Sequence, residues 1–173
     1  ESYKKESLQG DSVLQEIYSQ LGVETNFQGH CLVLSKKKNA VLPKNISLDL
    51  SSAPDIAQTI AVSCFGLGIS CDLTGLYTLK IKETDRLEAL NTELSKLGAE
   101  ISVTNDSLHL QSASTIVENI AIDTYNDHRM AMAFAPLALK TSISINDAEV
   151  VSKSYPDFWS DLQAMHFTVL KIS

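Results

Sequence analysis

An internal repeat of about seventy residues constrains the fold of this chain more than any other feature of its sequence. When the chain is aligned with itself at an offset of 76 residues, Leu21-Gly22 falls on Leu97-Gly98, and residues 31–34 fall on residues 107–110. Both copies have the pattern of an amphipathic helix that ends at a glycine and is followed by two strands. We therefore predict a chain built from units that share one order of elements.

The unit that spans approximately residues 45–115 has the clearest pattern and predicts the order β-α-β-α-β-β. Ser52 is expected to cap its first helix, with Pro54 in the first turn, and Thr84 is expected to cap its second. The predicted strands cover residues 46–50, 69–73, 77–81, 100–104 and 107–111, and the predicted helices cover residues 53–67 and 85–97.

A second alignment, at an offset of 72 residues, extends the repeat toward the end of the chain. It places Asp55 on Asp127. The unit that spans residues 116–173 is thus expected to repeat the order, with caps at Asn126 and Ser154. Its predicted strands cover residues 118–122, 142–145, 149–151 and 167–172, and its predicted helices cover residues 127–139 and 156–165.

The N-terminal unit, residues 1–44, is expected to be truncated, because it supplies only a second helix and closing strands. We expect residues 1–173 to form a single, partial domain of the α+β class, with the missing elements upstream in a longer parent protein. The chain starts at Glu1 and shows no apolar signal segment, which favours a trimmed chain of cytoplasmic origin.

Composition excludes several classes of protein. With 14 basic and 21 acidic residues the formal net charge is −7, which disfavours a nucleic-acid binder. The longest apolar run, residues 131–139, is interrupted by Pro136 and is far shorter than the roughly 20 residues that span a bilayer, so no membrane segment is expected. Cys31, Cys64 and Cys71 form no CxxC pair and lie in apolar stretches, so we expect reduced, buried thiols and no metal site.

The distribution of arginine is the first indication of chemistry. Of the 14 basic residues 12 are Lys, and the two Arg, Arg86 and Arg129, lie in dense polar strings. A planar guanidinium binds a carboxylate or phosphate through two parallel hydrogen bonds. Because each Arg also has an acidic neighbour, a pair of structural Arg–Asp contacts is an equally good interpretation at this point.

Charged residues gather at corresponding strand-to-helix junctions of successive units. If the units surround a common axis, the helix N-termini point to one place, where their dipoles and N–H groups attract anions. The junction residues are two carboxylates and four cations: Asp55, Glu83, Lys82, Arg86, Arg129 and Lys153. Against a net charge of −7, this local positive charge predicts a site for a small, multiply anionic substrate. The carboxylates can transfer protons there, although Asp55 alone is also typical of a helix N-terminus.

Three strings at these junctions resemble signatures of a known enzyme family. They are Lys82-Glu83-Thr84-Asp85-Arg86, Tyr125-Asn126-Asp127-His128-Arg129-Met130-Ala131-Met132 and Lys153-Ser154-Tyr155-Pro156-Asp157-Phe158. In order and spacing they resemble the C-terminal signatures of the 5-enolpyruvylshikimate-3-phosphate synthases, and Pro54-Asp55 before an Ala-rich helix resembles a fourth. The resemblance covers residues 45–165, and it reaches the first 45 residues only through the repeat.

The resemblance implies a fold and a reaction. Such enzymes have two domains of three β-α-β-α-β-β units each, an inside-out α/β barrel, with the active site between the domains. They transfer the enolpyruvyl group of phosphoenolpyruvate to the 5-hydroxyl of shikimate 3-phosphate and release phosphate, with no cofactor or metal. The implied partners of this chain are therefore the two small-molecule substrates and the missing domain, and the chain alone is expected to be inactive.

The resemblance also gives each junction residue a role. Asp55 resembles the base that takes the proton of the 5-hydroxyl, and Glu83 resembles the carboxylate that transfers a proton at the enol methylene. Lys82 resembles the cation that contacts the hydroxyls of shikimate 3-phosphate and exchanges protons, and Asp55 contacts the same substrate. The residues that resemble the clamp on phosphoenolpyruvate are Arg86, Arg129 and Lys153.

Two residues and two other functions stay open. His128 either contacts substrate or orients the cluster. Thr78 stands where many family members have a substrate-binding Asn, four residues before Lys82. An enolpyruvyl transferase acting on UDP-N-acetylglucosamine shares the fold but lacks the Asp-His-Arg-Met-Ala-Met string. A non-catalytic module derived from the fold is expected to lose the junction charges, all of which are present.

Overall fold

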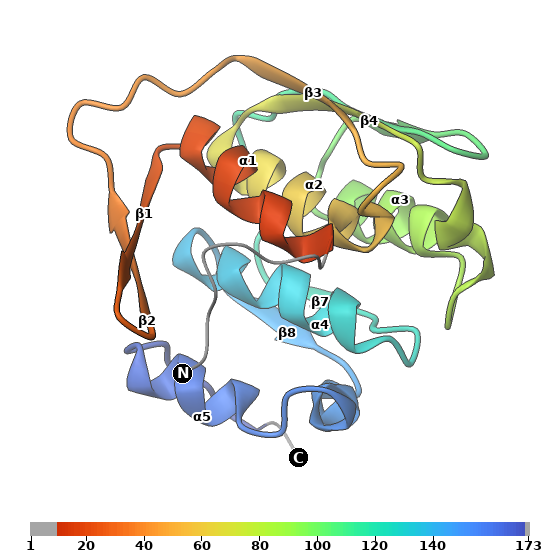
Figure 1. Ribbon diagram of the computed structural model, residues 1–173. Coiled ribbons are helices and arrows are strands. Elements are labelled where there is room, and N and C mark those ends of the chain that lie inside the picture. Colours follow the sequence, from red (N-terminus) through yellow and green to blue (C-terminus); the bar gives the residue numbers. More distant parts are fainter. Residues whose placement is uncertain (1–9, 172–173) are drawn as a thin grey trace.

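The computed structural model describes residues 10–171, and in Figure 1 some strands run along the left and the top of a group of helices while others pass behind it. The α-helices are α1 (Leu14–Gln20), α2 (Ala57–Leu67), α3 (Arg86–Lys96), α4 (His128–Phe134) and α5 (Phe158–Ala164). The strands are β1 (Val23–Gln28), β2 (Cys31–Lys36), β3 (Asn45–Asp49), β4 (Ser70–Thr74), β5 (Ile101–Val103), β6 (Leu108–Leu110), β7 (Ile120–Ile122) and β8 (Ile143–Ile145). The 3-10 helices are η1 (Gly10–Val13), η2 (Pro54–Ile56), η3 (Tyr77–Ile81), η4 (Ala135–Leu139) and η5 (Ala148–Lys153).

The strands of residues 10–171 form three sheets, one in each unit. The largest has the order β3-β4-β6-β5, in which β3 and β4 are parallel and the other neighbours are antiparallel. β1 and β2 form an antiparallel hairpin, and β7 is parallel to β8. The middle unit therefore runs β3-α2-β4-α3-β5-β6, which confirms the predicted order and the α+β class.

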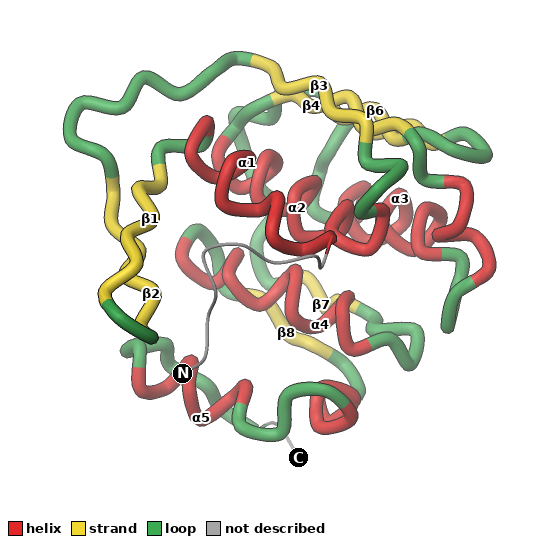
Figure 2. Tube along the Cα trace, viewed as in Figure 1, coloured by secondary structure: helices red, strands yellow, loops and turns green. Residues whose placement is uncertain are grey.

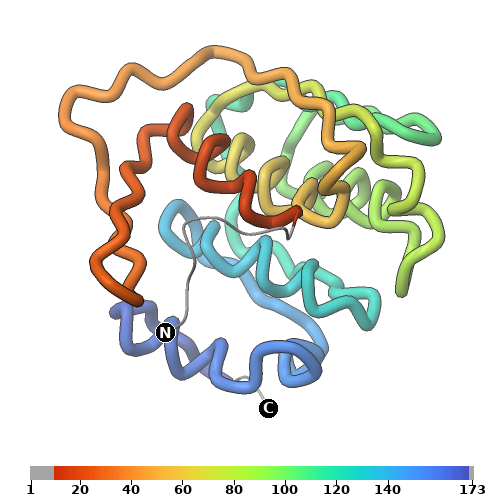
Figure 3. The backbone as a smooth tube through the Cα atoms, in the orientation of Figure 1, coloured from red at the N-terminus to blue at the C-terminus, as the bar shows by residue number. Residues whose placement is uncertain are grey.

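Helix α2 lies in the middle of the main hydrophobic core (Figure 2). Ile60 and Phe65 are almost fully buried, and even the polar side chain of Gln58 is excluded from solvent. A helix that is apolar nearly all round must be covered nearly all round, and α2 packs against β4, α3 and α4. The N-terminal unit adds α1 beside it (Figure 3), where the hydroxyls of Tyr18 and Ser63 are 2.6 Å apart.

Helix α4 connects this core to a smaller one. Its buried Met130 and Phe134 belong to the main core, whereas Ala131 belongs to a second cluster formed with η5 and α5. The other buried members of that cluster are Ala135, Val150, Val151, Phe158 and Leu162. Because α4 is packed on two sides, the residues at its N-terminus are held firmly in place.

The predicted strand at residues 77–81 is wrong, since this segment is the 3-10 helix η3. Its alternating polarity resembles a strand, but only Leu79 is buried, while Tyr77 and Ile81 are exposed. Both edges of β4 are already paired, with β3 and β6, so the segment has no edge of that strand to join. The chain turns away from β4 at Gly75, which has a φ of +75°. Glycine is required at this position because the Cβ of any other residue would collide with the backbone of Ser51.

Two predicted strands in the last unit are also wrong. Residues 149–151 belong to η5, which buries the adjacent side chains of Val150 and Val151 on one cluster, an arrangement that a strand with alternating sides cannot give. Residues 167–171 form no strand, and residue 172 lies outside the described residues.

Helices α3, α4 and α5 begin one or two residues later than predicted, α2 begins four residues later because η2 precedes it, and the capping residues differ. Asp85 and Asp127, rather than Thr84 and Asn126, accept the N-terminal hydrogen bonds of α3 and α4. Neither Ser52 nor Ser154 is a cap, because η2 begins after Ala53 and α5 begins after Asp157, and neither helix has a side-chain cap bond. Pro54 is the first residue of η2, close to its expected place in the first turn.

The cysteine prediction is confirmed for Cys64 and Cys71, which are fully buried and free, and is wrong for Cys31, which is exposed at the start of β2. Burial and the neighbouring Cys64 thiol raise the pKa of Cys71, with the contact to Cys64 the larger cause. Within residues 10–171, no helix combines the length and the apolar character needed to cross a membrane.

Candidate active site

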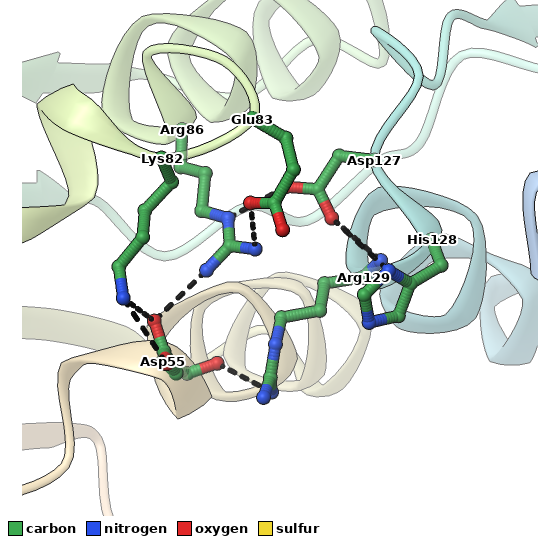
Figure 4. A network of polar contacts seen from close by, with 7 residues as sticks. All are labelled: Asp55, Lys82, Glu83, Arg86, Asp127, His128 and Arg129. Carbon is green, nitrogen blue, oxygen red and sulfur yellow. Dashed lines mark hydrogen bonds and ion pairs between the residues drawn. The ribbon is translucent and has the colours of Figure 1, made fainter. Parts of the chain in front are cut away.

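Residues that are far apart in the sequence meet where η2, α3 and α4 begin (Figure 4). η2 contributes Asp55, the segment before α3 contributes Lys82 and Glu83, and the first residue of α3 is Arg86. The start of α4 contributes Asp127 and Arg129. The middle unit (residues 45–115) and the last unit (residues 116–173) therefore supply opposite sides of one charged cluster, which we call the Arg86 cluster.

Arg86 is the hub of this cluster and is only 2% exposed. Its Nε donates to Asp127 Oδ2 at 2.6 Å, its Nη1 to Asp55 Oδ1 at 2.8 Å, and its Nη2 to Glu83 Oε2 at 2.7 Å. The structural Arg–Asp interpretation thus holds for Arg86. A guanidinium carries five N–H groups, so three carboxylates leave two of them on Nη1 and Nη2 for another acceptor.

Asp127 is the site residue that sequence reasoning missed. Its carboxylate is fully buried, and it accepts from Arg86 through one oxygen and from the backbone N–H of Arg129 at 2.8 Å through the other. The signal was present, because the repeat aligns Asp127 with Asp55, and both bind the same guanidinium. Asp127 therefore links α3 to α4.

Asp55 is surrounded by cations. Lys82 Nζ lies 3.1 Å from its Oδ1, and Arg129 Nη1 donates to its backbone carbonyl at 3.0 Å. Partial burial acts to raise the pKa of Asp55, but the hydrogen bond and charge of Lys82, with the charges of Arg129 and Arg86, outweigh it and hold the pKa below its usual value. Asp55 is thus ionised at neutral pH and is a weak base in this arrangement.

Cations with solvent contact lie around the buried hub. Lys82 is about a third exposed, Arg129 is half-buried, and Lys153 is exposed. Lys153 joins the cluster only indirectly, since its Nζ donates to the side-chain oxygen of Asn126 at 2.9 Å. Each of the two helix N-termini has one N–H group of its first turn occupied, because Asp85 accepts from the N–H of Glu88 and Asp127 from the N–H of Arg129. The side chains of Lys82, Arg129 and Lys153 therefore supply positive charge with solvent contact.

The two open residues differ in place. His128 Nδ1 is 4.0 Å from Asp127 Oδ1 and lies at the edge of the cluster. Thr78 is outside it: its hydroxyl oxygen is buried and has no hydrogen-bond partner among the described residues. Among those residues, no group of three or more His, Cys, Asp or Glu side chains is arranged to hold a metal ion.

The Arg86 cluster combines three carboxylates with three cations, and Lys153 nearby adds a fourth positive charge. Such a balanced cluster does not attract anions by bulk charge alone. The cluster can bind an anion at a place where cations lie nearer than carboxylates. Its neighbouring groups can also exchange protons, because the charge of each group shifts the pKa of the next.

Comparisons with known proteins point to one family. The family model of EPSP synthase (3-phosphoshikimate 1-carboxyvinyltransferase) matches residues 1–162. The 3-phosphoshikimate 1-carboxyvinyltransferase of Bacteroides fragilis strain YCH46 is 43% identical over 168 residues, which are 95% of this chain and 40% of the relative. The enzyme of the same name from Photobacterium damsela subsp. piscicida is 36% identical over 163 residues, 93% of this chain and 37% of the relative.

A solved structure shows the same fold. EPSP synthase from Acinetobacter baumannii superposes with a TM-score of 0.70 at 24% sequence identity, covering 86% of this chain and 37% of the other. This chain spans about 40% of the length of the relatives it matches. The match of the family model over most of the chain, and the shared fold, show that this chain belongs to the EPSP synthase family.

Proposed function

We propose that this chain supplies one wall of the active site of a 3-phosphoshikimate 1-carboxyvinyltransferase. The enzyme would transfer the enolpyruvyl group of phosphoenolpyruvate to the 5-hydroxyl of shikimate 3-phosphate and release phosphate, a step of aromatic amino acid biosynthesis. The observation that carries the proposal is the Arg86 cluster, because residues of the family-like strings, remote in sequence, meet there through direct hydrogen bonds. A second domain, in a longer cytoplasmic protein, would supply the other wall.

In this proposal the cations bind the anionic groups of phosphoenolpyruvate. Arg129 and Lys153 have solvent contact and can meet the phosphate and carboxylate directly, whereas Arg86 offers its two remaining N–H groups. Fixed cations of this kind also stabilise the negative charge of a tetrahedral intermediate. No cofactor is required for an addition followed by an elimination.

Asp55 and Glu83 would move the protons. The pKa of Asp55 is lowered by Lys82, Arg129 and Arg86, against the opposing effect of burial. When a substrate anion binds these cations, their field at Asp55 weakens, and the carboxylate becomes a stronger base. Binding would therefore prepare Asp55 to take the proton of the 5-hydroxyl, with Lys82 beside it to contact the same substrate and share the proton. Glu83, half exposed at the cluster edge, would act at the enol methylene.

The proposal is tested by phosphate release in the presence of both substrates, measured for the longer enzyme and for the 173-residue chain. The longer enzyme should turn over, and the chain alone should not, since one wall cannot enclose two anions and exclude water. Phosphoenolpyruvate should bind the chain weakly, more weakly as salt increases. Full turnover by the isolated chain, or none by the longer enzyme, would contradict the proposal.

Glu83→Gln in the longer enzyme tests a catalytic role, with Glu88→Gln, an exposed glutamate in the first turn of the adjacent helix α3, as the matched control. Loss of a proton-transfer group should lower kcat by roughly 100-fold. Glu88→Gln should leave kcat unchanged. Equal activity of the two variants would remove Glu83 from the mechanism.

A different measurement tests the alternative function. Activity of the longer enzyme with UDP-N-acetylglucosamine instead of shikimate 3-phosphate would favour the related transferase.

A further inference from the structure

Two consecutive residues before α4 have a left-handed backbone. Tyr125 has a φ of +53° and Asn126 a φ of +59°. Side chains with a Cβ are disfavoured in this region, and Tyr more so than Asn, so such a turn persists only where surrounding contacts hold it. The turn must therefore be stabilised by groups outside itself.

The anion-binding side chains depend on this turn. Asn126 accepts the hydrogen bond of Lys153 at 2.9 Å, and the next residue, Asp127, binds Arg86. Arg129, two residues further on, reaches the backbone of Asp55. A change in the turn would thus move several charged groups of the Arg86 cluster together.

A second polar cluster holds the turn from the other side. Glu93, on α3, is fully buried, and it accepts from the Tyr125 hydroxyl at 2.6 Å and from the Asp123 backbone N–H at 3.2 Å. Lys96 Nζ donates to both Glu93 oxygens and to Asp123 Oδ2, all within 2.9 Å. Asn146 donates to the other oxygen of Asp123 at 2.7 Å. The Glu93 carboxylate is thus bonded to residues at both ends of the segment 123–125.

Tyr125 is a dependable donor in this cluster. Burial, followed by the hydrogen bond and charge of Glu93, raises the pKa of Tyr125 to about 12, so its hydroxyl keeps its proton at physiological pH. Helix α3 then contacts the segment before α4 at two places, through Arg86 at its first turn and through Glu93 two turns later. One rigid helix sets both contacts.

We propose that Glu93, acting through the Tyr125 hydroxyl and the Asp123 amide, is a positioning residue that keeps Arg129 and Lys153 in place for anion binding. This inference rests on the proposed function for the identity of the anion. The structural part, that Glu93 holds the left-handed turn, does not depend on it.

Tyr125→Phe tests the inference in the longer enzyme, because it removes only the hydroxyl. Tyr18→Phe is the matched control, because it also removes one 2.6 Å hydroxyl contact, the one to Ser63. Tyr18 lies on α1, a helix that contributes no residue to the Arg86 cluster. Tyr125→Phe should raise KM for phosphoenolpyruvate about tenfold, the order of one hydrogen bond to a charged acceptor, and change kcat less. Tyr18→Phe should lower Tm without changing KM. If Tyr125→Phe also lowers only Tm, Glu93 has a structural role and the inference is wrong.

Amide hydrogen exchange of the 173-residue chain supplies a second measurement that needs no activity. The N–H groups of Asp127 and Arg129 donate to Thr124 O and Asp127 Oδ1. In Glu93→Gln and in Tyr125→Phe they should exchange about tenfold faster, with amides of α2 unchanged. Unchanged exchange would overturn the inference. Absence of phosphoenolpyruvate binding by the wild-type longer enzyme would instead refute the proposed function, while the exchange result would still decide whether Glu93 holds the turn.

Discussion

Helices α3 and α4 begin in the same way and yet have different connections. Asp85 caps α3 by accepting from the N–H of Glu88, and Asp127 caps α4 by accepting from the N–H of Arg129. The side chain of Asp85 is more than a third exposed, and within residues 10–171 its other charged partner is Lys80, at 3.8 Å. Asp127 is fully buried and spends its second oxygen on Arg86. The same local signal thus marks a simple helix cap in one unit and a bridge between units in the other.

The difference shows that burial, more than residue type, decides what a capping carboxylate does. An exposed cap satisfies one orphan N–H and is largely replaceable by other small polar residues. A buried carboxylate beside a buried guanidinium cannot be removed without leaving an uncompensated charge. Substitutions of Asp85 and of Asp127 should therefore lower the free energy of unfolding by very different amounts.

The largest difference is expected between Asp127→Ala and Asp85→Ala. Removing Asp127 unpairs part of the buried Arg86 and should lower the free energy of unfolding by about 3 kcal/mol. Removing Asp85 should cost about 1 kcal/mol, the value of a cap. Urea denaturation of the 173-residue chain measures both. Equal losses would mean that Asp55 and Glu83 suffice for Arg86.

The stabilities of the two asparagine variants, Asp85→Asn and Asp127→Asn, should differ by less. Asn is as good a cap as Asp, so Asp85→Asn should change stability by no more than about 0.5 kcal/mol. Asp127→Asn keeps the cap but loses the charge that faces Arg86, which should cost about 1–2 kcal/mol. If both variants unfold at the wild-type urea concentration, the charge of Asp127 is unimportant.

Acid should weaken the side of the Arg86 cluster formed by Asp55, the repeat equivalent of Asp127. Because the pKa of Asp55 is lowered in the folded chain, its contribution is present above its unfolded value of 3.8 and is lost as the pH falls through the lower folded value. Asp55→Asn should therefore reduce the loss of stability on acidification from about pH 5 to pH 3. Asp11→Asn, at an exposed position, is the control and should behave as wild type. Identical acid sensitivity of the two variants would contradict the assignment.

The smallest effect is expected at the opposite ends of the helices, where the repeat places Gly98 after α3 and His166 after α5. Both are left-handed, at φ +92° and +69°. His166→Gly should raise the free energy of unfolding by about 0.5–1 kcal/mol, because Gly adopts this region without a steric penalty. Gly98→Ala should lower it, since an added Cβ would also lie 3.2 Å from Val117. Thermal unfolding distinguishes the two signs, and destabilisation by His166→Gly would show that the imidazole makes a stabilising contact.

Sequence periodicity predicted the helices and the order of the middle unit well, because apolar spacing and glycine ends are local signals. It failed at residues 77–81, where alternation looked like a strand. Whether such a segment becomes a strand depends on a free sheet edge, and β4 has none. The sequence also located Arg86 and Arg129, since rare arginines lay in dense polar strings.

The contacts of those residues could not be read from the strings. The sequence shows that Asp127 precedes α4, but not that it is buried against a residue 41 positions away. The sequence groups Lys153 with the other cations, but it does not show that Lys153 bonds to Asn126 and so reaches the Arg86 cluster only through that residue. Long-range pairing of this kind depends on how the units pack, which no local pattern specifies.

The three cysteines give the chain a chemical asymmetry. Cys64 and Cys71 are fully buried in the main core, whereas Cys31 is exposed on the β1–β2 hairpin. A thiol reagent such as a maleimide should therefore react first, and under native conditions almost only, at Cys31. The wild-type sequence thus provides a single attachment point for a fluorophore or spin label on the N-terminal unit, without any engineered cysteine.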